Sequence, residues 1–226
     1  MTWPAPARRA DRASVVALIP AYLEDRHIRD VASRTLKQLD RLVVVDDGST
    51  DRTSEEARAG GAEVIRHKVN RGKGAAIKTG LGKLLDEGVE YVLLLDGDGQ
   101  HLPEEIPRFF DADPAHLVVG NRMVDSRSMP LVRRMTNRFM SWHVSRVCRQ
   151  LIPDSQCGFR MIHRALIPQL FLRSNTYEYE TEMLFVAARA GFVIGAVPVT
   201  PVYGDEKSKI RPVRDTIHFF KLIARY

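Results

Sequence analysis

The fold is constrained most by an alternation of short apolar runs with segments of helical periodicity. The runs are Val15 to Ile19, Leu42 to Val45, Ala62 to Arg66 and Val92 to Leu95. Each has the length of a strand that is buried on both faces, and the segments between them are long enough for crossover helices. Strands that alternate with helices at this spacing form right-handed crossovers. The pattern therefore predicts an α/β domain with a doubly wound, mostly parallel sheet flanked by helices.

Polar and charged residues follow directly after these apolar runs. Pro20-Ala21-Tyr22, Asp46-Asp47 and Asp96-Gly97-Asp98 follow three of them, and Asn121-Arg122 follows a fifth expected strand at Leu117 to Gly120. In open parallel sheets, ligands bind in the crevice outside the carboxyl ends of the strands. We therefore expect these residues to converge on one binding site.

The stretch YVLLLDGDGQH carries the strongest chemical signal. Side chains alternate along an extended chain, so Asp96 and Asp98 should project to the same side beyond the strand, and Gly97 and Gly99 permit close approach of another group. Two neighbouring carboxylates favour a cation between them, and an oxygen-rich set with Gln100 suits Mg²⁺ or Mn²⁺ better than Zn²⁺. The alternative is a solvated acidic turn, because Asp and Gly are ordinary turn residues.

The length and composition indicate one soluble domain. The chain has 226 residues, 44% of them hydrophobic, and no apolar run that approaches the ~20 residues needed to cross a bilayer. We expect a disordered leader over residues 1–13, a folded domain over 14–212 and a C-terminal amphipathic helix over 213–226. The only cysteines, Cys148 and Cys157, cannot form a disulfide framework, which favours a reducing cytoplasm.

The net charge of +6 predicts a partner that is an anion. Basic residues concentrate in Arg122 to Arg149 and in Lys207 to Arg214, with few interleaved aromatic residues, so phosphates of small molecules or lipids are favoured over nucleic acid. The segment Leu131 to Leu151 has the pattern of a basic amphipathic helix, which could face the core or lie on a membrane. The remaining expected elements are helices at Pro103 to Phe110, Ala165 to Leu172 and Glu180 to Ala190, and strands at Cys157 to Ile162 and Phe192 to Val199.

Eight motifs together resemble a known family. They are IPAYLE, VVDDGSTD, GKGAAIKTG, LLLDGDGQH, GNR, DSQCGFR, YEYETEML and YGDEKSKIRP, and they extend from about Val15 to Pro212. In this order they are similar to family 2 glycosyltransferases of the GT-A fold, and most similar to the dolichol-phosphate mannosyltransferase type, also called polyprenyl-phosphate glycosyltransferases. The resemblance implies a metal-dependent, inverting enzyme with a single nucleotide-sugar-binding domain. It would move a hexose, mannose or glucose, from a GDP- or UDP-sugar to a polyprenyl or dolichyl phosphate.

The resemblance also implies roles for individual residues. The nucleotide sugar would be held by Pro20, Ala21, Tyr22, Glu24, Asp46, Asp47, Lys73, Asp96, Gly97, Asp98, Lys209 and Arg211. The metal would be held by Asp96, Asp98 and Gln100, and the acceptor phosphate by Arg122, Arg133 and Asn137. The catalytic residues would be Asp98, Arg122 and Arg133, and the site would also be lined by Asp154 and Glu182. A closing loop would contain Ser208, Lys209 and Arg211. Gly72-Lys73-Gly74 is read as a wall of the nucleotide pocket, or alternatively as a simple helix start.

The acceptor decides the mechanism. A phosphate monoester is already an anion at neutral pH and needs no base, whereas a hydroxyl acceptor needs a carboxylate such as Glu178, Glu180 or Glu182. A hydroxyl acceptor on the same fold is therefore the main alternative. A sugar-phosphate nucleotidylyltransferase is less favoured, because Pro20-Ala21-Tyr22 replaces its glycine-rich opening, and a nucleic-acid-binding module ranks last.

Two departures from the family pattern concern the metal motif and the membrane. Many relatives have Ala where this chain has Gly97, which we expect to alter only local stiffness. Many relatives also append transmembrane helices, which this sequence does not show. We therefore expect a cytoplasmic protein that is peripheral at the cytoplasmic face of the membrane, held there by its basic amphipathic helices.

Overall fold

The computed structural model describes residues 9–124, 129, 131–170 and 179–202. In this part of the chain one sheet has the strand order β3-β2-β1-β4-β6-β5-β7. The strands are β1 (Val15–Ala21), β2 (Leu42–Asp46), β3 (Glu63–Arg66), β4 (Tyr91–Leu94), β5 (Leu117–Asn121), β6 (Arg160–His163) and β7 (Ile194–Pro198). The α-helices are α1 (Ile28–Gln38), α2 (Thr53–Ala59), α3 (Lys73–Asp86), α4 (Pro107–Phe110), α5 (Leu131–Cys148) and α6 (Tyr179–Arg189). Short 3₁₀ turns are η1 (Arg12–Ser14), η2 (Pro103–Glu105) and η3 (Ile167–Gln169).

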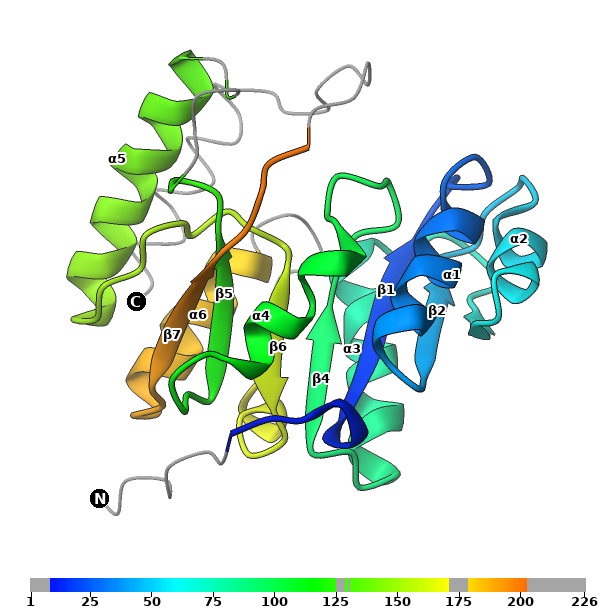
Figure 1. Ribbon diagram of the computed structural model, residues 1–226, viewed down its shortest axis with the longest axis horizontal. Coiled ribbons are helices and arrows are strands. Elements are labelled where there is room, and N and C mark those ends of the chain that lie inside the picture. Colours follow the sequence, from blue (N-terminus) through cyan, green and yellow to red (C-terminus); the bar gives the residue numbers. More distant parts are fainter. Residues whose placement is uncertain (1–8, 125–128, 130, 171–178, 203–226) are drawn as a thin grey trace.

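Helices cover both faces of the sheet. Figure 1 shows α1 and α4 in front of it and α3 and α6 behind it, with α2 at one end of the molecule and α5 at the other. β1 pairs in parallel with β2 and β4, and β2 pairs in parallel with β3. This arrangement confirms the predicted doubly wound, mostly parallel α/β fold.

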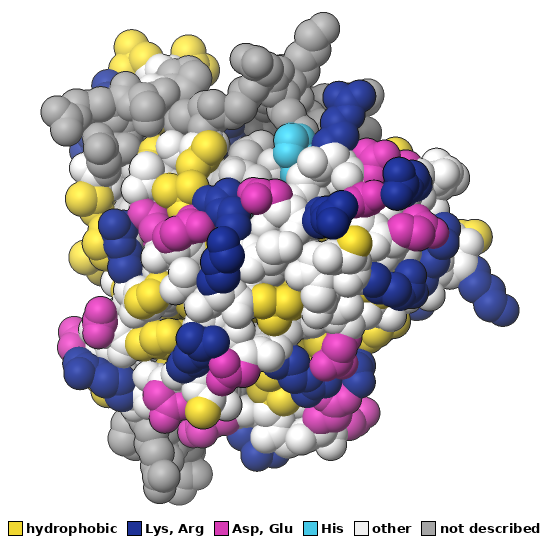
Figure 2. Space-filling view, turned by 45° about the vertical axis from the view of Figure 1, so that its right-hand side comes forward, with side chains coloured by type: hydrophobic (Ala, Val, Ile, Leu, Met, Phe, Trp, Pro, Cys, Tyr) yellow, Lys and Arg dark blue, Asp and Glu magenta, His cyan; other side chains and the backbone are white. Residues whose placement is uncertain are grey.

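Charges of opposite sign are mixed over the end of the molecule that carries α1 and α2. On the face shown in Figure 2, basic and acidic side chains alternate. Several of them form surface ion pairs: Arg52 lies 2.8 Å from Glu56, and Arg34 lies 2.7 Å from Glu104. At this end of the molecule, basic side chains therefore have acidic neighbours.

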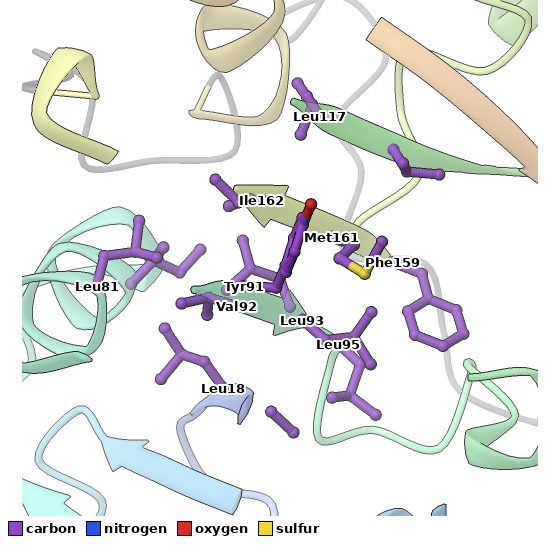
Figure 3. Packing of buried hydrophobic residues seen from close by; sticks show 14 of the residues in the cluster. Leu18, Leu81, Tyr91, Val92, Leu93, Leu95, Leu117, Phe159, Met161 and Ile162 are labelled. Carbon is purple, nitrogen blue, oxygen red and sulfur yellow. The ribbon is translucent and has the colours of Figure 1, made fainter. Parts of the chain in front are cut away.

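The core consists of the central strands and the helix faces that cover them. Val43, Val44 and Val45 of β2 are completely buried, as expected for a strand covered on both faces. A Cβ atom on Gly80 of α3 would lie 2.3 Å from Leu18 Cδ1, so glycine allows α3 to pack closely on β1. Figure 3 shows Leu18 close to Leu81 of the same helix. This contact sets the position of α3, whose first residue is Lys73.

β6 runs antiparallel to both of its neighbours. Arg160 pairs with Leu94 of β4 and with Val119 of β5. Because its direction is reversed, β6 begins at the edge of the sheet where β4 and β5 end. The segment before β6, Asp154 to Phe159, therefore lies at the edge where the parallel strands deliver their polar residues.

The structure corrects several expected elements. The strand expected at Cys157 to Ile162 is Arg160–His163, and in the described part of the segment 165–172 the expected helix is only the 3₁₀ turn η3, because Pro168 has no N–H to donate. The helix expected to reach Leu151 ends at Cys148, since Arg149 has a φ of 53°.

The segments expected at the two ends of the chain are only partly covered. Residues 9–13 of the expected leader are described, and they include Asp11, which caps η1, and Arg12, which lies 2.7 Å from Asp40. The segment 213–226 and the predicted loop residues Lys209 and Arg211 lie outside the described residues. Within the described ranges, none of the helices combines the length and the apolar character that a membrane span requires.

Candidate functional site

The predicted polar residues meet at one edge of the sheet. Ala21 at the end of β1 pairs with Asp46 at the end of β2, and Leu18 of β1 pairs with Leu94 of β4. Asp96 and Asp98 follow β4 at this edge, and Arg122 follows β5. The carboxyl ends of the parallel strands therefore bring the expected site residues together.

Asp46 and Asp47 support the loops around the site. Asp46 has no exposed surface, and its oxygens accept hydrogen bonds from Ser49 N (2.9 Å) and from Ser54 Oγ. Both of its oxygens already have partners inside the protein. Asp46 therefore supports the loop after β2, and its predicted contact with the nucleotide stays a prediction.

Asp47 holds the segment that leads into α3. Its carboxylate accepts the backbone N–H groups of Arg71 at 3.0 Å and Gly72 at 2.7 Å, and its Oδ1 lies 2.6 Å from His67 Nδ1. Gly72 has a φ of 94°, which favours glycine at the residue before the helix. Asp47 is 2% exposed and positions the segment before Lys73 through these hydrogen bonds, and its predicted contact with the nucleotide stays a prediction.

Lys73 connects two carboxylates across the site. Its Nζ lies 2.8 Å from Asp96 Oδ1 and 2.8 Å from Glu180 Oε1. Burial lowers the pKa of Lys73, but Asp96 and Glu180 outweigh that effect and the pKa is raised. Lys73 therefore stays protonated and places a positive charge next to the acidic motif after β4.

Asp96 is ionised in this environment. Burial raises the pKa of Asp96, but the positive charge of Lys73 and the contact with His101 Nε2 at 3.4 Å outweigh it, so the pKa lies well below its usual value. Gly158 approaches the same carboxylate so closely that a Cβ there would lie 2.9 Å from Asp96 Oδ2. Asp96 is thus held from three sides.

The pair Asp96 and Asp98 fits a divalent cation. Burial and the charge of Asp96 raise the pKa of Asp98, and a cation between such carboxylates relieves this repulsion. The backbone N–H of Gln100 donates to Asp98 Oδ1 at 3.0 Å and fixes its orientation. Among the described residues no three His, Cys, Asp or Glu side chains form a metal cluster. Carboxylate oxygens are the donor type that hard divalent cations such as Mg²⁺ and Mn²⁺ prefer, so Asp96 and Asp98 stay the predicted metal ligands.

Gly97 is packed more tightly than we expected from the sequence. A Cβ on this residue would lie 3.2 Å from Ile28 Cδ1 and 3.3 Å from Ile19 Cγ2. The prediction that glycine here affects only local stiffness is therefore incomplete, because the residue also allows the turn to approach α1.

The loop after β1 is tied to the loop after β2. Leu23 N donates to Ser49 Oγ at 3.0 Å, and Glu24 N donates to Thr53 Oγ1 at 2.9 Å. Tyr22 is 40% exposed, and Pro20 lines a small cavity together with Lys73 and Asp96. Pro20, Ala21, Tyr22 and Glu24 therefore lie at the predicted edge, and their contacts with a nucleotide stay a prediction.

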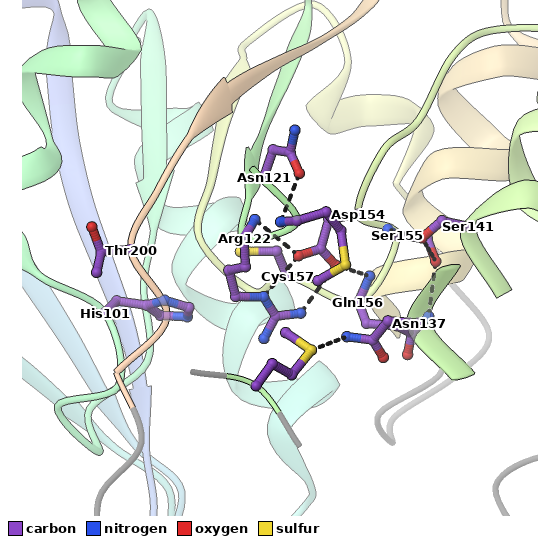
Figure 4. Close-up of polar contacts among 12 residues, drawn as sticks. His101, Asn121, Arg122, Asn137, Ser141, Asp154, Ser155, Gln156, Cys157 and Thr200 are labelled. Atoms are coloured by element: carbon purple, nitrogen blue, oxygen red, sulfur yellow. Dashed lines mark hydrogen bonds and ion pairs between the residues drawn. The ribbon is translucent and has the colours of Figure 1, made fainter. Parts of the chain in front are cut away.

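Arg122 is held by Asp154. Its Nε and Nη2 lie 2.8 Å and 3.0 Å from the two carboxylate oxygens, and its backbone N–H donates to Asp154 Oδ2 at 3.2 Å. Figure 4 shows this pair between the end of β5 and the segment that carries Ser155 and Cys157. Burial raises the pKa of Asp154, but Arg122 outweighs this and the pKa is lowered. The pair fixes the guanidinium group in one orientation.

The two other predicted acceptor residues belong to α5. Asn137 is 7% exposed, and its side-chain amide lies 4.0 Å from Met129 Sδ. Arg133 is partly exposed on the same helix. Ser141, one turn after Asn137 on α5, contacts Ser155, the residue after Asp154, so α5 packs against the segment that holds Arg122 (Figure 4).

Arg160 is the main residue that the sequence reading missed. Its side chain is completely buried and donates to the carbonyl oxygens of Cys157 (2.7 Å), Ser155 (2.9 Å) and Glu180. Burial lowers the pKa of Arg160. The arginine in the motif DSQCGFR was the available signal, because a charged residue within an otherwise apolar strand segment needs buried partners. Arg160 connects the segment before β6 to the start of α6.

Comparisons with known proteins agree with this geometry. The family model described as "Glycosyl transferase family 2" matches residues 16–171. The chain is 29% identical over 215 residues to a UDP-N-acetylglucosamine–dolichyl-phosphate N-acetylglucosaminyltransferase of Methanococcus voltae, covering 84% of this chain and 86% of that protein. It is 30% identical over 204 residues to an undecaprenyl-phosphate mannosyltransferase of Micrococcus luteus, covering 82% of each.

A similar fold is found among solved structures. The crystal structure of glucosyl-3-phosphoglycerate synthase from Mycobacterium tuberculosis, in complex with Mn²⁺, UDP and glucosyl-3-phosphoglycerate, superimposes with a TM-score of 0.66 at 21% identity. The match covers 99% of this chain and 84% of that one. At this identity the likeness establishes the fold.

Proposed function

Because the chain belongs to glycosyltransferase family 2, and is therefore a glycosyltransferase, we propose that it transfers a hexose from a GDP- or UDP-sugar to a polyprenyl phosphate with inversion. Two similar proteins are named for transfer to dolichyl phosphate and undecaprenyl phosphate, which supports a lipid-phosphate acceptor. The structural neighbour with Mn²⁺ and UDP supports a nucleotide sugar and a divalent metal at this site.

The observation that supports a phosphate acceptor is that the carboxylates which could act as a base are paired or buried. Asp154 is bound to Arg122, and Glu180 is bound to Lys73. Glu182 is 2% exposed. A carboxylate oxygen that is bound to a cation is not available to an acceptor hydroxyl, and a buried carboxylate does not reach one. The pKa of Asp98 is raised instead, and we assign this carboxylate to the metal. Glu178, another candidate base from the sequence, lies outside the residues that the structure describes.

An acceptor that is already an anion fits these charges. Arg122, oriented by Asp154, and Arg133 would bind the phosphate of the acceptor through parallel hydrogen bonds. One phosphate oxygen would then attack the anomeric carbon from the side opposite the diphosphate. The new bond forms as the bond to the leaving diphosphate breaks, so no proton has to move and no base is required.

The leaving diphosphate gains negative charge during the reaction. Lys73, at the first residue of α3, places its ammonium group and the helix N-terminus at this edge of the sheet. Asp96 and Asp98, with Gln100, would hold Mg²⁺ or Mn²⁺, which acts as a Lewis acid on the diphosphate. Lys209 and Arg211 would close over the same group.

The acceptor can be identified directly. The purified full chain with Mn²⁺ is offered radiolabelled GDP-mannose or UDP-glucose together with a short-chain polyprenyl phosphate or the corresponding unphosphorylated alcohol. We expect label in the lipid phosphate and none in the alcohol. Label in the alcohol alone would instead establish the hydroxyl-acceptor alternative.

A pair of adjacent arginines provides a matched control. With the short-chain phosphate, Arg133→Ala should raise the KM for the acceptor about 10- to 100-fold, the range expected for losing charged hydrogen bonds, while slow hydrolysis of the donor by water persists. Arg134→Ala makes the same substitution one residue further along α5 and should leave the KM unchanged. Equal effects of the two variants would remove Arg133 from the acceptor site.

A further inference from the structure

Glu105 in η2 is a buried carboxylate that the proposed reaction does not use. Its side chain is 6% exposed, and its oxygens Oε2 and Oε1 accept the backbone N–H of Thr200 at 2.9 Å and 3.1 Å. Oε1 also accepts the Thr200 hydroxyl at 2.7 Å and lies 2.7 Å from Arg108 Nη1. A carboxylate that has left water needs such partners. Glu105 therefore connects η2 to a residue 95 positions later in the sequence.

The end of β7 is held by side chains of η2 and α4. β7 is the last strand in the order of the described sheet, and it pairs there with β5. Arg108 Nη1 of α4 donates to Pro198 O at 3.0 Å, and Glu105 binds Thr200 two residues later. Helix α4 contacts β7 (Figure 1). These side chains support the strand end where the described part of the chain has no further strand.

The end of β7 in turn holds the end of β5. The strand pairing of β6 with β5 covers residues 117–119, whereas β7 pairs with β5 as far as Asn121. Beyond this pair, Val199 N donates to Asn121 O at 3.1 Å. A Cβ on Gly120 would lie 3.0 Å from Val199 Cγ2, so the two segments are in tight contact. Arg122 is the next residue after Asn121, so its backbone position depends on this contact.

η2 is itself fixed on two sides. Residues 96–101, which we call the acidic turn, lead directly into η2, whose first residue is Pro103. On the other side, Arg34 Nη2 of α1 lies 2.7 Å from Glu104 Oε2. Glu105 therefore extends from a short turn whose position is set by the acidic turn and by α1.

We propose that Glu105 is a positioning residue for sugar transfer. Through Thr200 and Val199 it fixes the backbone of Arg122 relative to the acidic turn. The inference rests on the proposed function, in which Arg122 binds the acceptor phosphate and the acidic turn holds the metal on the donor side. The acceptor oxygen must approach the anomeric carbon in line, and a misplacement of about 1 Å can lower the rate about 100-fold. The contribution of Glu105 is the distance between these two groups.

The hydrogen bonds of Glu105 require a carboxylate. A carboxylate only accepts hydrogen bonds, and Glu105 faces three donor groups, which belong to Thr200 and Arg108. The amide of Glu105→Gln has one acceptor oxygen and would turn its NH₂ group toward one of these donors. Glu104→Gln makes the same substitution one residue earlier, where the partner is Arg34 of α1, and is therefore the matched control. Thr200→Val removes only the hydroxyl group of the partner, and Thr200→Ser retains it.

Two rates of the full chain with Mn²⁺ and radiolabelled donor test the inference. The first is transfer to the short-chain polyprenyl phosphate, and the second is hydrolysis of the donor by water without acceptor. Hydrolysis does not require Arg122, whereas the proposed transfer does. Glu105→Gln should lower the ratio of transfer to hydrolysis about 30-fold, and Thr200→Val about 5-fold. Glu104→Gln and Thr200→Ser should leave this ratio unchanged.

Amide hydrogen exchange measured by NMR gives a readout without catalysis. The Val199 N–H donates to Asn121 O, so its exchange should become about 10-fold faster in Glu105→Gln and stay at the wild-type rate in Glu104→Gln. The amides of β1, at the centre of the sheet, report global unfolding in the same samples. Their exchange should be the same in both variants.

The outcomes separate positioning from a purely structural role and from the proposed function. A structural role would lower transfer and hydrolysis in proportion, with faster exchange in β1 as well, and would overturn the inference. Equal ratios for Glu104→Gln and Glu105→Gln, or unchanged exchange of Val199 in Glu105→Gln, would overturn it too. A wild type that transfers sugar to neither the lipid phosphate nor the alcohol would contradict the proposed function and, with it, the role of Glu105 in transfer. The exchange of Val199 would then still show whether Glu105 holds the end of β5.

Discussion

Removal of the Lys73 ammonium group tests the centre of the site. Lys73 Nζ contacts Asp96 and Glu180, and Lys73→Met keeps most of the side-chain volume while leaving these carboxylates without their shared cation. Breaking a fully buried ion pair costs about 3–5 kcal/mol, and breaking an exposed one costs about 0–1 kcal/mol. The three side chains are 25%, 26% and 12% exposed, so the site is intermediate between these cases. We expect the free energy of unfolding to fall by about 2 kcal/mol at pH 7.

The same helix contains a matched control. Lys83 is also on α3, and it pairs with Glu87 one turn later at the surface, where its side chain is 36% exposed. Lys83→Met should lower the free energy of unfolding by only about 0.5 kcal/mol, the usual value for such a pair. Urea denaturation followed by circular dichroism measures both variants under one condition. Equal losses for the two lysines would refute the conclusion that Lys73 neutralises buried carboxylates.

Metal binding gives a second measurement for the same variant. In the wild-type chain, Lys73 contacts Asp96 Oδ1, which is also an oxygen that we assign to the metal. Without nucleotide, Mn²⁺ should therefore raise the melting temperature of Lys73→Met more than that of the wild type, because binding to the native state stabilises it. A smaller rise in the variant than in the wild type would mean that Lys73 supports the metal site instead of competing with it.

Three further substitutions test other parts of the site. Asp98→Asn should abolish transfer and the stabilisation by Mn²⁺, yet leave the metal-free protein at least as stable as the wild type, because it removes repulsion from Asp96. Turnover near normal would remove Asp98 from the metal site. Asp154→Asn should lower the free energy of unfolding by about 3 kcal/mol at pH 7. The pKa of Asp154 is lowered in the folded state, so its ion pair stabilises the wild type at pH values above the usual carboxyl pKa. The difference in unfolding free energy between the wild type and Asp154→Asn should therefore shrink as the pH falls below about 4. Urea titrations at about pH 7 and about pH 3.5 measure this difference. Gly158→Ala should lower kcat roughly 100-fold with only a small change in melting temperature, because its Cβ would displace the Asp96 carboxylate; unchanged kcat would contradict that contact.

The parallel half of the fold follows from the sequence because its signals are local. Each apolar run of β1, β2 and β4 is continuous, α1 and α2 follow β1 and β2, and α3 leads into β4. Parallel strands place their carboxyl ends at one edge, so the positions of Asp47, Asp96 and Arg122 at that edge also follow from the pattern. The family resemblance added the glycosyltransferase assignment, which the family model confirms.

The antiparallel strand could not be predicted from local patterns. The direction of β6 depends on its pairing with β4 and β5, which are distant in the sequence, and periodicity carries no information about direction. For the same reason the sequence reading gave Asp154 only a place near the site and gave Arg160 no role. Their partners, Arg122 and the carbonyl groups of Ser155, Cys157 and Glu180, become neighbours only through this pairing.

The roles of Asp46 and Asp47 show a different limit. A carboxylate after a strand is equally suited to bind a ligand or to accept backbone N–H groups, and the sequence does not distinguish the two. The difference is decided by burial: Asp46 and Asp47 are 0% and 2% exposed, whereas about a quarter of the Asp96 side chain is exposed. In the structure both residues hold neighbouring loops in place, and their contacts with a nucleotide stay a prediction.

The contacts around β6 connect the two halves of the proposed site. Lys73 is the first residue of α3, on the proposed donor side, and it pairs with Glu180 at the start of α6. The backbone carbonyl of Glu180 accepts a hydrogen bond from Arg160, which also binds the carbonyl of Ser155 next to Asp154. Asp154 in turn orients Arg122. A movement of Lys73 from Asp96 toward a bound diphosphate would change its distance to Glu180. Arg160 connects Glu180 to the segment with Asp154, which positions Arg122. The proposed donor and acceptor sites are therefore connected by one chain of contacts through Glu180, Arg160 and Asp154.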